Sequence, residues 1–254
     1  MVRLAATLLT VLALGYLALC LALFVFQRSL IYYPQPRSTG SAATTLNFKV
    51  ADADLAVTVR PVAGPQAILY FGGNAEDVSL NLPSFSEAFP AHAMYLLHYR
   101  GYGGSTGRPS EQALQADALA LFDHVRQKHP KVVLIGRSLG SGVAIQVASQ
   151  RPVHRLVLVT PYNSLQELAE KQFPYFPVKC LLTDKFESWK YAPLVTAPTL
   201  LIAAEHDEVI PRWSTEQLYA RFKNSSATLE VLPGTSHNTL SASPSYLGLL
   251  QSVL

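Results

Sequence analysis

The sequence predicts an α/β protein in which helices cover both faces of a mostly parallel sheet, preceded by one N-terminal transmembrane helix. Two observations predict this fold. The chain begins with a long apolar run that contains no charge, and from residue 67 onward short apolar runs alternate with candidate helices. The length of 254 residues allows one large domain with a hydrophobic core.

The apolar run from Leu4 to Phe26 favours a retained membrane anchor over residues 1–29. It exceeds the roughly 20 apolar residues that a helix needs to cross the hydrocarbon core. It also exceeds the roughly 7–15 residue apolar core of a cleaved signal peptide, and no small-x-small cleavage site closes it. A buried core helix would show a polar face, and lipidation at Cys20 would need a small residue in place of Leu19. Basic residues flank both ends of the run, so positive charge does not define its orientation.

The segment after the anchor predicts a linker and then an antiparallel hairpin. Residues 27–45 mix aromatic residues, proline, serine and glycine without periodicity, which is typical of a linker. Residues 46–62, LNFKVADADLAVTVRPV, alternate apolar and polar side chains around Asp52–Asp54. Such alternation about a central turn indicates two paired strands.

The rest of the chain predicts parallel strands joined by helices. Six short apolar runs each end in a turn, and unbroken apolar strands are typical of a parallel sheet that is buried on both faces. These runs are AILYFGG, AMYLLHYRG, VVLIGRS, RLVLVTP, TLLIAAEHD and TLEVLPG. The expected helices cover Glu111–Lys128, Gly142–Gln150, Thr215–Phe222 and a terminal stretch from Ser243. Ligands bind such sheets at the carboxyl ends of the strands, so functional residues are expected in the loops there.

One interval interrupts this alternation. Residues 161–198, named here the cap segment, are rich in proline and aromatic residues and predict no strand before Thr199. We interpret the cap segment as an excursion over the carboxyl edge of the sheet, within a domain that covers residues 30–254. Its sequence FPYFP, at Phe173–Pro177, is expected to line an acyl groove or touch the bilayer, with core packing as the alternative.

The composition excludes two classes of site. The chain has 20 Lys and Arg residues against 17 Asp and Glu, a formal net charge of +3, and no Lys/Arg run longer than two residues. A nucleic-acid partner is therefore not expected. The two cysteines, Cys20 and Cys180, form no CxxC or Cys/His cluster, so no metal site is expected. The chemistry inferred below requires no organic cofactor.

The sequence Gly-Arg-Ser-Leu-Gly follows a strand-like run and places Ser138 in a sharp turn before a helix. This arrangement is typical of an activated nucleophile, because Gly136 and Gly140 leave room for a strained backbone around the serine. The turn also places the backbone N–H of Leu139 at a helix N-terminus, where it can donate to a developing oxyanion. A P-loop would need a lysine in this turn, and no GxGxxG pattern is present. An ordinary glycine turn is the alternative interpretation.

A reactive serine needs a base and a third group that orients the base. His237 is the predicted base because it lies in a loop after the last strand, which follows the chain order Ser, acid, His. The acid is expected after the preceding strand, where acidic residues cluster. We choose Asp207 because the apolar residues after it are expected to hold it inward, and Glu205 is the alternative.

A second oxyanion donor is expected in the Gly-Gly-Asn loop after the first parallel strand. Backbone amides in a glycine-rich loop can closely approach a substrate. We choose the backbone N–H of Asn74, with that of Gly73 as the alternative. The alternative interpretation is that these residues form an ordinary turn without a catalytic role.

The motifs YFGGNAED, HYRGYGGSTGRPSE, GRSLGSG, PYNSL, HDEVIP and PGTSHN resemble, in order and spacing, the α/β-hydrolase superfamily. The resemblance is specifically to its membrane-anchored serine hydrolases, and it extends from about Leu30 to the C-terminus. It implies a doubly wound sheet of about eight strands and a catalytic triad of Ser138, Asp207 and His237.

Three positions depart from the pattern of that family. Gly72 stands where the family usually has His, His98 where it has Asp, and Glu205 where it has Gly. None of these changes removes a catalytic group. Three further residues are expected to have a structural role in the loop under the site, namely Arg100, Tyr102 and Gly103.

These observations predict a membrane-bound serine hydrolase that cleaves carboxylic ester or thioester bonds of small acyl or lipid-like substrates through an acyl-enzyme intermediate. The lipid bilayer is the expected partner, since an anchor favours lipid-like substrates over dilute soluble ones. A serine peptidase or amidase is one alternative, because the same triad serves both reactions. A catalytically silent binding module on the membrane is the other, and the altered glycine loop is the feature that supports it.

Overall fold

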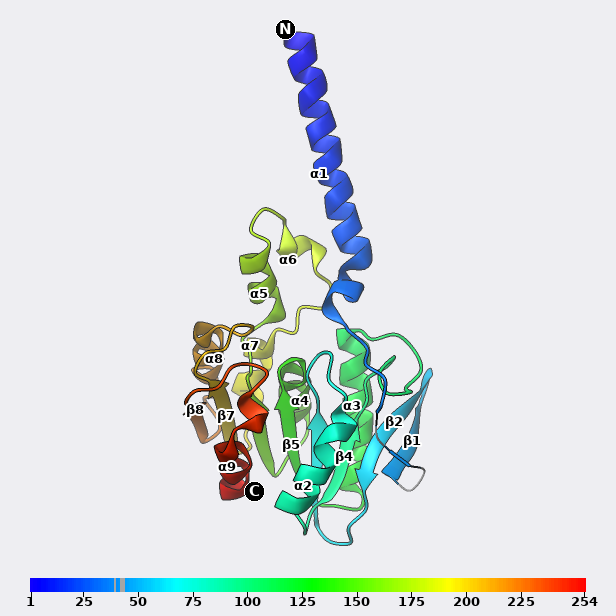
Figure 1. Cartoon of the computed structure of the whole chain (residues 1–254), viewed down its shortest axis with the longest axis vertical. Coiled ribbons are helices and arrows are strands. Elements are labelled where there is room, and N and C mark those ends of the chain that lie inside the picture. Colours follow the sequence, from blue (N-terminus) through cyan, green and yellow to red (C-terminus); the bar gives the residue numbers. More distant parts are fainter. Residues whose placement is uncertain (39, 42–43) are drawn as a thin grey trace.

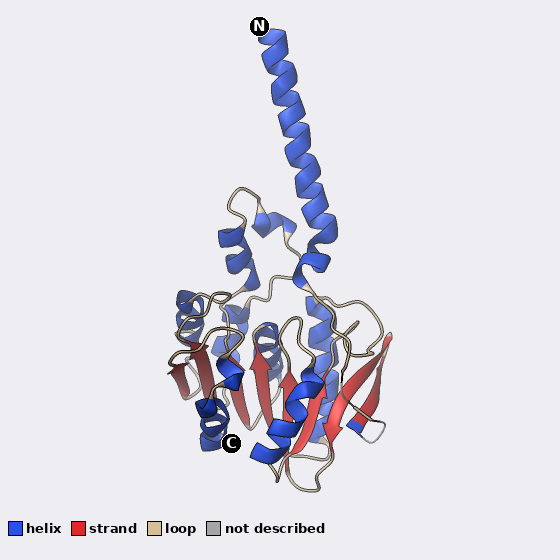
Figure 2. Cartoon of the chain, viewed as in Figure 1, coloured by secondary structure: helices blue, strands red, loops and turns tan. Residues whose placement is uncertain are grey.

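In a computed structural model, which describes residues 1–38, 40–41 and 44–254, the chain forms one eight-stranded sheet flanked by helices (Figure 1 and Figure 2). The strand order is β1-β2-β4-β3-β5-β6-β7-β8. β1 and β4 pair antiparallel with β2, and every other neighbouring pair is parallel. The predicted fold class is therefore confirmed. The strands are β1 (Thr45–Val50), β2 (Ala53–Arg60), β3 (Gln66–Phe71), β4 (Ala93–Leu97), β5 (Lys131–Arg137), β6 (Arg155–Val159), β7 (Thr199–Ala204) and β8 (Ala227–Leu232).

The inner strands are buried along their length, whereas the two outer strands are not. Every residue of β4 and of β7 is buried, although their side chains alternate between the two faces of the sheet. Burial on both faces explains why these runs show no polar alternation in the sequence. The edge strands β1 and β8 alternate partly buried and exposed residues, because one of their sides faces solvent.

Helices cover the two faces of the sheet through separate apolar clusters. On one face, α3 (Glu111–Arg126), α4 (Leu139–Gln150) and α8 (Arg212–Tyr219) pack around fully buried residues such as Phe122. On the other face, α2 (Leu82–Ala88) and α9 (Pro244–Val253) contribute Phe85 and Tyr246, beside the short helices η2 (Val78–Asn81) and η4 (Leu240–Ala242). Both faces are filled, so substrate has access only at the ends of the strands.

Some helix boundaries differ from the sequence expectation. α4 begins at Leu139 rather than at Gly142. The glycines of its first turn are part of the helix, because each packs closely against neighbouring groups. α8 begins directly after Pro211 rather than at Thr215, since the fixed φ of proline suits the start of a helix. α2 is not evident in the sequence, because seven residues give too little periodicity.

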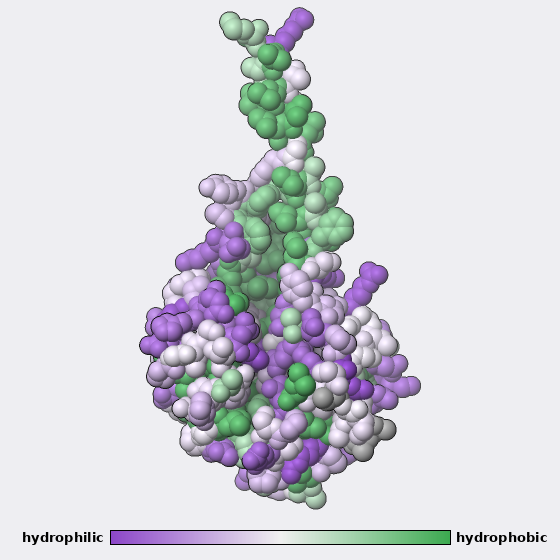
Figure 3. Space-filling model, viewed as in Figure 1, coloured by the Kyte–Doolittle hydropathy of each residue, from purple (hydrophilic) through white to green (hydrophobic). Residues whose placement is uncertain are grey.

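α1 (Val2–Ile31) is a continuous helix of 30 residues that projects away from the sheet (Figure 1). At 1.5 Å per residue it is about 45 Å long. It is long and apolar enough to cross a membrane, and only 6% of its most apolar window is buried. Figure 3 shows apolar residues along this helix and on the adjoining surface below it.

The first half of the cap segment lies beside the C-terminal half of α1, whereas its second half packs against α4 (Figure 1). It contains α5 (Leu165–Gln172), α6 (Val178–Leu181), α7 (Ser188–Tyr191) and η3 (Ala192–Leu194). The prolines of this segment keep its helices short, because proline cannot continue the hydrogen-bonding pattern of a helix interior. No residue of the cap segment belongs to the sheet.

Polar contacts join the end of α1 to the cap segment. The Arg28 Nε atom lies 3.1 Å from Asp184 Oδ2, and the Tyr32 hydroxyl donates to the same oxygen at 3.0 Å. The side-chain oxygen of Gln27, a buried residue, accepts a hydrogen bond from the Thr183 N–H at 2.7 Å. These bonds fix the direction of α1 relative to the domain.

The predicted linker, residues 27–45, begins inside α1, which extends to Ile31, and the residues directly after the helix pack onto the domain. The Tyr33 N–H donates to Asn74 Oδ1 at 3.0 Å, and the carbonyl of Gln35 accepts from the Gly103 N–H at 2.9 Å. Residues 39 and 42–43 of this linker lie outside the described residues. The chain that leaves α1 therefore contacts the loops at the ends of β3 and β4.

Candidate active site

The candidate residues lie in loops that follow neighbouring parallel strands. Ser138 follows β5, Asp207 follows β7 and His237 follows β8, while the Gly73-Asn74 loop follows β3. Parallel pairing places the carboxyl ends of these strands at one edge of the sheet. The structure thereby brings together residues that lie far apart in the sequence.

Ser138 has a strained backbone, with φ 48° and ψ −117°. A non-glycine residue with positive φ costs about 1–3 kcal/mol, which the surrounding packing must offset. The two flanking glycines allow the turn: a Cβ at Gly136 would overlap the carbonyl of Gly140, and a Cβ at Gly140 would overlap the carbonyl of Phe71. The turn presents the Ser138 side chain at the strand end, in the wall of a cavity.

Ser138, His237 and Asp207 form one hydrogen-bonded chain. His237 Nε2 lies 3.1 Å from Ser138 Oγ, and His237 Nδ1 lies 2.9 Å and 3.0 Å from the two carboxylate oxygens of Asp207. The side chains of His237 and Asp207 are only 8% and 6% exposed, so water does not compete for their contact. An imidazole held in this way can accept the proton of the serine hydroxyl.

The structure distinguishes Asp207 from Glu205, the alternative acid. Asp207 Oδ1 accepts hydrogen bonds from the N–H groups of Val209 and Ile210 at 2.9 Å and 2.6 Å, which hold the carboxylate inward. Glu205 is about half exposed and accepts from the Gly234 N–H at 2.8 Å instead. Of the two carboxylates, only that of Asp207 is hydrogen-bonded to His237.

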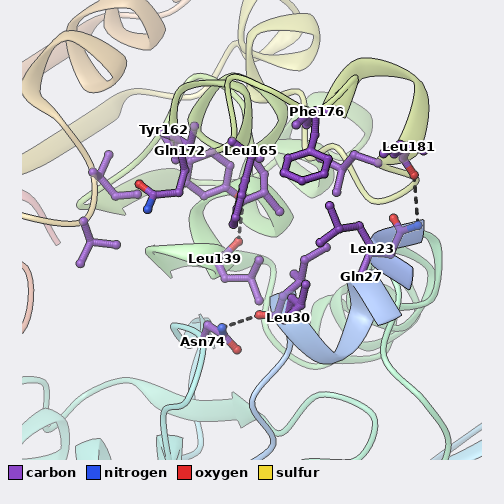
Figure 4. Close-up of a pocket in the computed structure, with 18 of the residues that line it drawn as sticks. Leu23, Gln27, Leu30, Asn74, Leu139, Tyr162, Leu165, Gln172, Phe176 and Leu181 are labelled. Atoms are coloured by element: carbon purple, nitrogen blue, oxygen red, sulfur yellow. Dashed lines mark hydrogen bonds between the residues drawn. The ribbon is translucent and has the colours of Figure 1, made fainter. Parts of the chain in front are cut away.

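The predicted oxyanion donors occupy one wall of the cavity. Within the described part of the chain, the backbone N–H groups of Leu139 and Asn74 have no protein acceptor. Both residues line the cavity beside Ser138, as Figure 4 shows for Asn74 and Leu139. The N–H of Gly73, the alternative donor, is occupied, because it donates to Glu76 Oε2 at 2.5 Å.

The side chain of Asn74 fixes its loop to the end of α1. Asn74 Oδ1 accepts from the Tyr102 hydroxyl at 2.7 Å, in addition to the Tyr33 N–H. Asn74 Nδ2 donates to the carbonyl of Ile31 at 2.5 Å. The loop therefore owes its conformation to side-chain hydrogen bonds, although it lacks the histidine usual in the resembling family.

Two charged residues near the site, Glu76 and Arg137, are not marked as functional by any motif in the sequence. Glu76 Oε2 accepts from Gly73 and lies 3.6 Å from Arg137 Nη1, and both side chains are largely buried. Arg137 precedes Ser138 and donates to the carbonyl of His237 at 3.4 Å. The only sequence signal for this pair is a charge next to each glycine motif, which does not reveal that the two side chains meet.

The loop under the site is held by buried polar groups. Arg100 donates two hydrogen bonds of 2.8 Å to the carboxylate of Asp117 and a third to Asp52. His98 is 2% exposed, contacts Thr58 Oγ1 at 2.9 Å, and occupies the space that a side chain at Gly103 would need. Burial lowers the pKa of His98 to about 4, so the ring is neutral at pH 7.

An apolar cavity of about 390 Å³ extends from the candidate triad toward α1 (Figure 4). Ser138 and Leu139 line one end, and Leu165 and Phe176 of the cap segment line its wall. α1 contributes further residues, among them Leu23. The volume of the cavity lies within the usual range for pockets that hold a small molecule.

Metal ligands are not clustered in this site. Among the described residues, no group of three or more His, Cys, Asp or Glu side chains has an arrangement suited to a metal ion. Cys20 and Cys180 both have free thiols.

The sheet, the strained serine turn and the loop order together define the α/β-hydrolase class. Comparison with known proteins specifies this further: the chain belongs to the family described as serine aminopeptidase, S33, whose family model matches residues 88–186 and 168–243. The resemblance predicted from the sequence motifs is confirmed.

Several known proteins are similar to this chain. An uncharacterised protein of Mycobacterium tuberculosis is 34% identical over 234 residues, which cover 84% of this chain and 80% of the relative. An α/β-hydrolase domain-containing protein of Caenorhabditis elegans is 32% identical over 206 residues, covering 77% and 60%. An uncharacterised membrane protein of Saccharomyces cerevisiae is 28% identical over 173 residues, covering 64% and 60%.

Among solved structures, an esterase of Pyrococcus furiosus superimposes with a TM-score of 0.67. The match covers 87% of this chain and 97% of the esterase at 18% sequence identity. At this identity the likeness concerns the fold.

Proposed function

We propose that this protein is a membrane-anchored serine hydrolase that cleaves carboxylic ester or thioester bonds of lipid-like acyl substrates. The observation that carries the proposal is the hydrogen-bonded chain from Ser138 through His237 to Asp207 beside an apolar cavity. A serine oriented in this way can attack a carbonyl carbon.

In the proposed reaction, Ser138 Oγ attacks the substrate carbonyl while His237 Nε2 takes the hydroxyl proton. Asp207 keeps the other imidazole proton on Nδ1 and stabilises the imidazolium cation. His237 then gives its proton to the leaving alcohol or thiol, which leaves Ser138 acylated. A water molecule next gives a proton to His237 Nε2 and attacks the acyl group. His237 returns this proton to Ser138 Oγ as the bond from Oγ to the acyl carbon breaks, which releases the free acid and regenerates the serine.

The backbone N–H groups of Leu139 and Asn74 are the proposed oxyanion donors. The N–H of Leu139 lies at the start of α4, where the helix dipole favours negative charge. Each such donor contributes roughly 3–4 kcal/mol to stabilisation of a tetrahedral oxyanion in comparable sites. Neither N–H has a protein acceptor in the described residues that substrate would need to displace.

The cavity favours an acyl ester over the substrate of an aminopeptidase, the activity that the family description names. An aminopeptidase must hold a free N-terminal amine, and burying that cation requires a paired charge. None of the described residues that line this cavity is Asp or Glu, and most are Leu, Ile, Val or aromatic. An uncharged hydrocarbon chain matches such a lining.

α1 is the proposed anchor. Its most apolar window is almost entirely exposed, which would be unfavourable in water but suits a lipid environment. A related yeast protein is described as a membrane protein, which agrees with this placement.

Labelling with a fluorophosphonate tests the proposal. The detergent-solubilised wild-type chain is expected to react, and Ser138→Ala is expected to lose labelling together with at least about 10³-fold of its esterase activity. A matched ester, thioester and amide with the same acyl group then define the bond that is cleaved, with the amide expected to be slowest. A folded wild-type chain that does not react would instead support a silent binding module.

A further inference from the structure

We propose that the acyl chain of a bilayer lipid reaches Ser138 directly from the membrane, through the space between α1 and the cap segment. This inference rests on the proposed function and adds the source of the substrate and its path of entry. It follows from how deep α1 must lie in the membrane and from which residues line the cavity.

The position of the polar residues limits where α1 can cross the hydrocarbon core. Arg3 lies at one end and Gln27 at the other, and about 20 helical residues span a core of roughly 30 Å. Every span of about 20 residues between Arg3 and Gln27 contains Tyr16. In each of them, Tyr16 is at least about seven residues from the C-terminal end of the span. At 1.5 Å per residue, Tyr16 therefore lies about 10 Å or more inside the hydrocarbon region.

The cap segment contacts α1 at this depth. The ring of Phe176 stacks on that of Tyr16, with centroids 5.8 Å apart and planes within 9°, and the Tyr16 hydroxyl donates to the carbonyl of Tyr175 at 2.9 Å. Phe173 and Tyr175 are 43% and 85% exposed. Because this contact fixes their height, the residues Phe173–Pro177, named here the cap tip, lie within the bilayer on the proposed placement.

Two charged residues flank the cap tip in the sequence. Lys171 precedes the tip and Lys179 follows it, and both are exposed. The Lys171 ammonium group lies 3.8 Å from the centre of the Trp213 ring, a pairing of cation and aromatic group. Lysine and tryptophan are favourable at the interface between hydrocarbon and water.

The cavity connects this depth with the candidate nucleophile. Phe176, which stacks on Tyr16, also lines the cavity, and so does Leu23 of α1 near the edge of the hydrocarbon span. Ser138 lines the same cavity at its other end. Figure 4 shows Leu23, Leu30 and Phe176 around this space, and Figure 3 shows apolar surface that continues from α1 onto the domain.

α1 therefore forms part of the acyl site in addition to anchoring the domain. A lipid acyl chain can remain in contact with apolar groups along the path from the bilayer to Ser138, so it avoids exposure to water. A soluble ester would gain nothing from this route. The proposed occupant of the channel is thus a chain from the surrounding bilayer.

The test uses the full-length chain in vesicles and a fluorogenic ester with two long acyl chains, which does not exchange between vesicles. The ester is placed either in the vesicles that hold the protein or in separate ones. We expect hydrolysis only when protein and ester share a bilayer. Equal hydrolysis of ester in separate vesicles would overturn the proposal.

A matched pair of variants tests the channel itself. Leu23→Trp narrows the cavity from α1, whereas Leu21→Trp places the same ring on the exposed side of the helix, where Leu21 is 62% exposed. The ratio of kcat/KM for the long-chain ester to that for p-nitrophenyl acetate is expected to fall about tenfold or more in Leu23→Trp, because roughly two methylenes lose their buried site. Leu21→Trp is expected to keep the wild-type ratio.

The outcomes separate this inference from the proposed function. A wild-type chain that labels at Ser138 and hydrolyses p-nitrophenyl acetate, but whose two tryptophan variants give equal ratios, would refute the channel alone. Failure of both labelling and short-ester hydrolysis would refute the proposed hydrolase itself.

Discussion

Glu76 is a carboxylate that joins the segments around the candidate site. It accepts from Gly73 in the oxyanion loop, and it faces Arg137, which in turn donates to the carbonyl of His237. Its other oxygen accepts from the Tyr70 hydroxyl at 2.7 Å. Glu76 is not among the described residues that line the cavity beside Ser138, so its expected role is to position the loops.

Replacing Glu76 by Gln is expected to lower kcat about 10- to 100-fold with KM changed less than about twofold, because small displacements of catalytic groups are costly. The amide keeps the size of the side chain and removes the charge that faces Arg137. Glu87→Gln, an exposed position on α2, is the control for loss of one negative charge. Unchanged kcat in a folded Glu76→Gln enzyme would contradict the positioning role.

His98 predicts a pH dependence of stability. Burial lowers its pKa in the folded chain to about 4 from 6.5. Between these values the unfolded chain binds a proton that the folded chain does not, so stability decreases as pH falls below about 6.5. From about pH 7.5 to pH 5, His98 alone is expected to cost the folded state about 2 kcal/mol.

Denaturant unfolding in detergent at the two pH values measures this effect. The variant His98→Asn is expected to lose about 2 kcal/mol less than wild type between them, since it has no proton to gain. Equal pH dependence in the two proteins would show that other groups, such as the remaining histidines, cause it.

At the residue level, motif and chain order indicate the serine and the histidine of the candidate triad, whereas the acid stays open between two neighbouring carboxylates. Ser138 and His237 follow from motif and loop position, and the structure brings Asp207 rather than Glu205 to the imidazole. Glu76 and Arg137 were not predictable, because their contact depends on how two separate loops pack. The free N–H of Asn74 and the occupied N–H of Gly73 likewise depend on that packing.

At the level of elements, the turn between β5 and α4 sets the position of the nucleophile. Gly140 lies in the first turn of α4 against the backbone at the end of β3. A helical glycine normally costs about 0.5–1 kcal/mol relative to alanine. Here the close approach of the Phe71 carbonyl outweighs that preference.

The variant Gly140→Ala is therefore expected to destabilise the protein by about 1–3 kcal/mol, the usual range for overpacking, and to slow fluorophosphonate labelling. Gly248→Ala is the control, because Gly248 lies in α9 with no heavy atom near the added Cβ. That change is expected to stabilise by up to about 1 kcal/mol. Thermal unfolding of both variants checks the opposite signs, and a stabilised Gly140→Ala would refute the packing argument.

Strands were more predictable than the short helices of the fold. Each apolar run that the sequence marks became a strand, because burial on both faces leaves a continuous apolar pattern. The helices of the cap segment could not be delimited, since each has only three to eight residues. Their position beside α1 depends on long-range contacts such as that of Arg28 with Asp184.

At the scale of the whole molecule, the proposed membrane placement rests on α1 and the cap segment. On the proposed placement the cap tip is immersed, whereas α2 lies at the opposite end of the molecule (Figure 1). This orientation can be measured by fluorescence.

A single tryptophan at Tyr175 is expected to be quenched by nitroxide-labelled acyl chains. The variant carries Trp189→Phe and Trp213→Phe, so that Tyr175→Trp supplies the only indole. Glu87→Trp in the same background is the control and is expected to escape quenching. Equal quenching at the two sites would contradict the immersion of the cap tip.

The hydrogen bonds of Gln27, Arg28 and Tyr32 attach the end of α1 rigidly to the cap segment. An enzyme on a flexible linker keeps the same active site in membranes of different thickness. An enzyme whose anchor is rigidly attached beside the active site does not. Adjusting to a thicker or thinner bilayer shifts or tilts the helix, and the entrance to the active site must move with it. Turnover of a membrane ester should therefore respond to the hydrophobic thickness of the host bilayer, which would make the protein sensitive to the lipid composition around it.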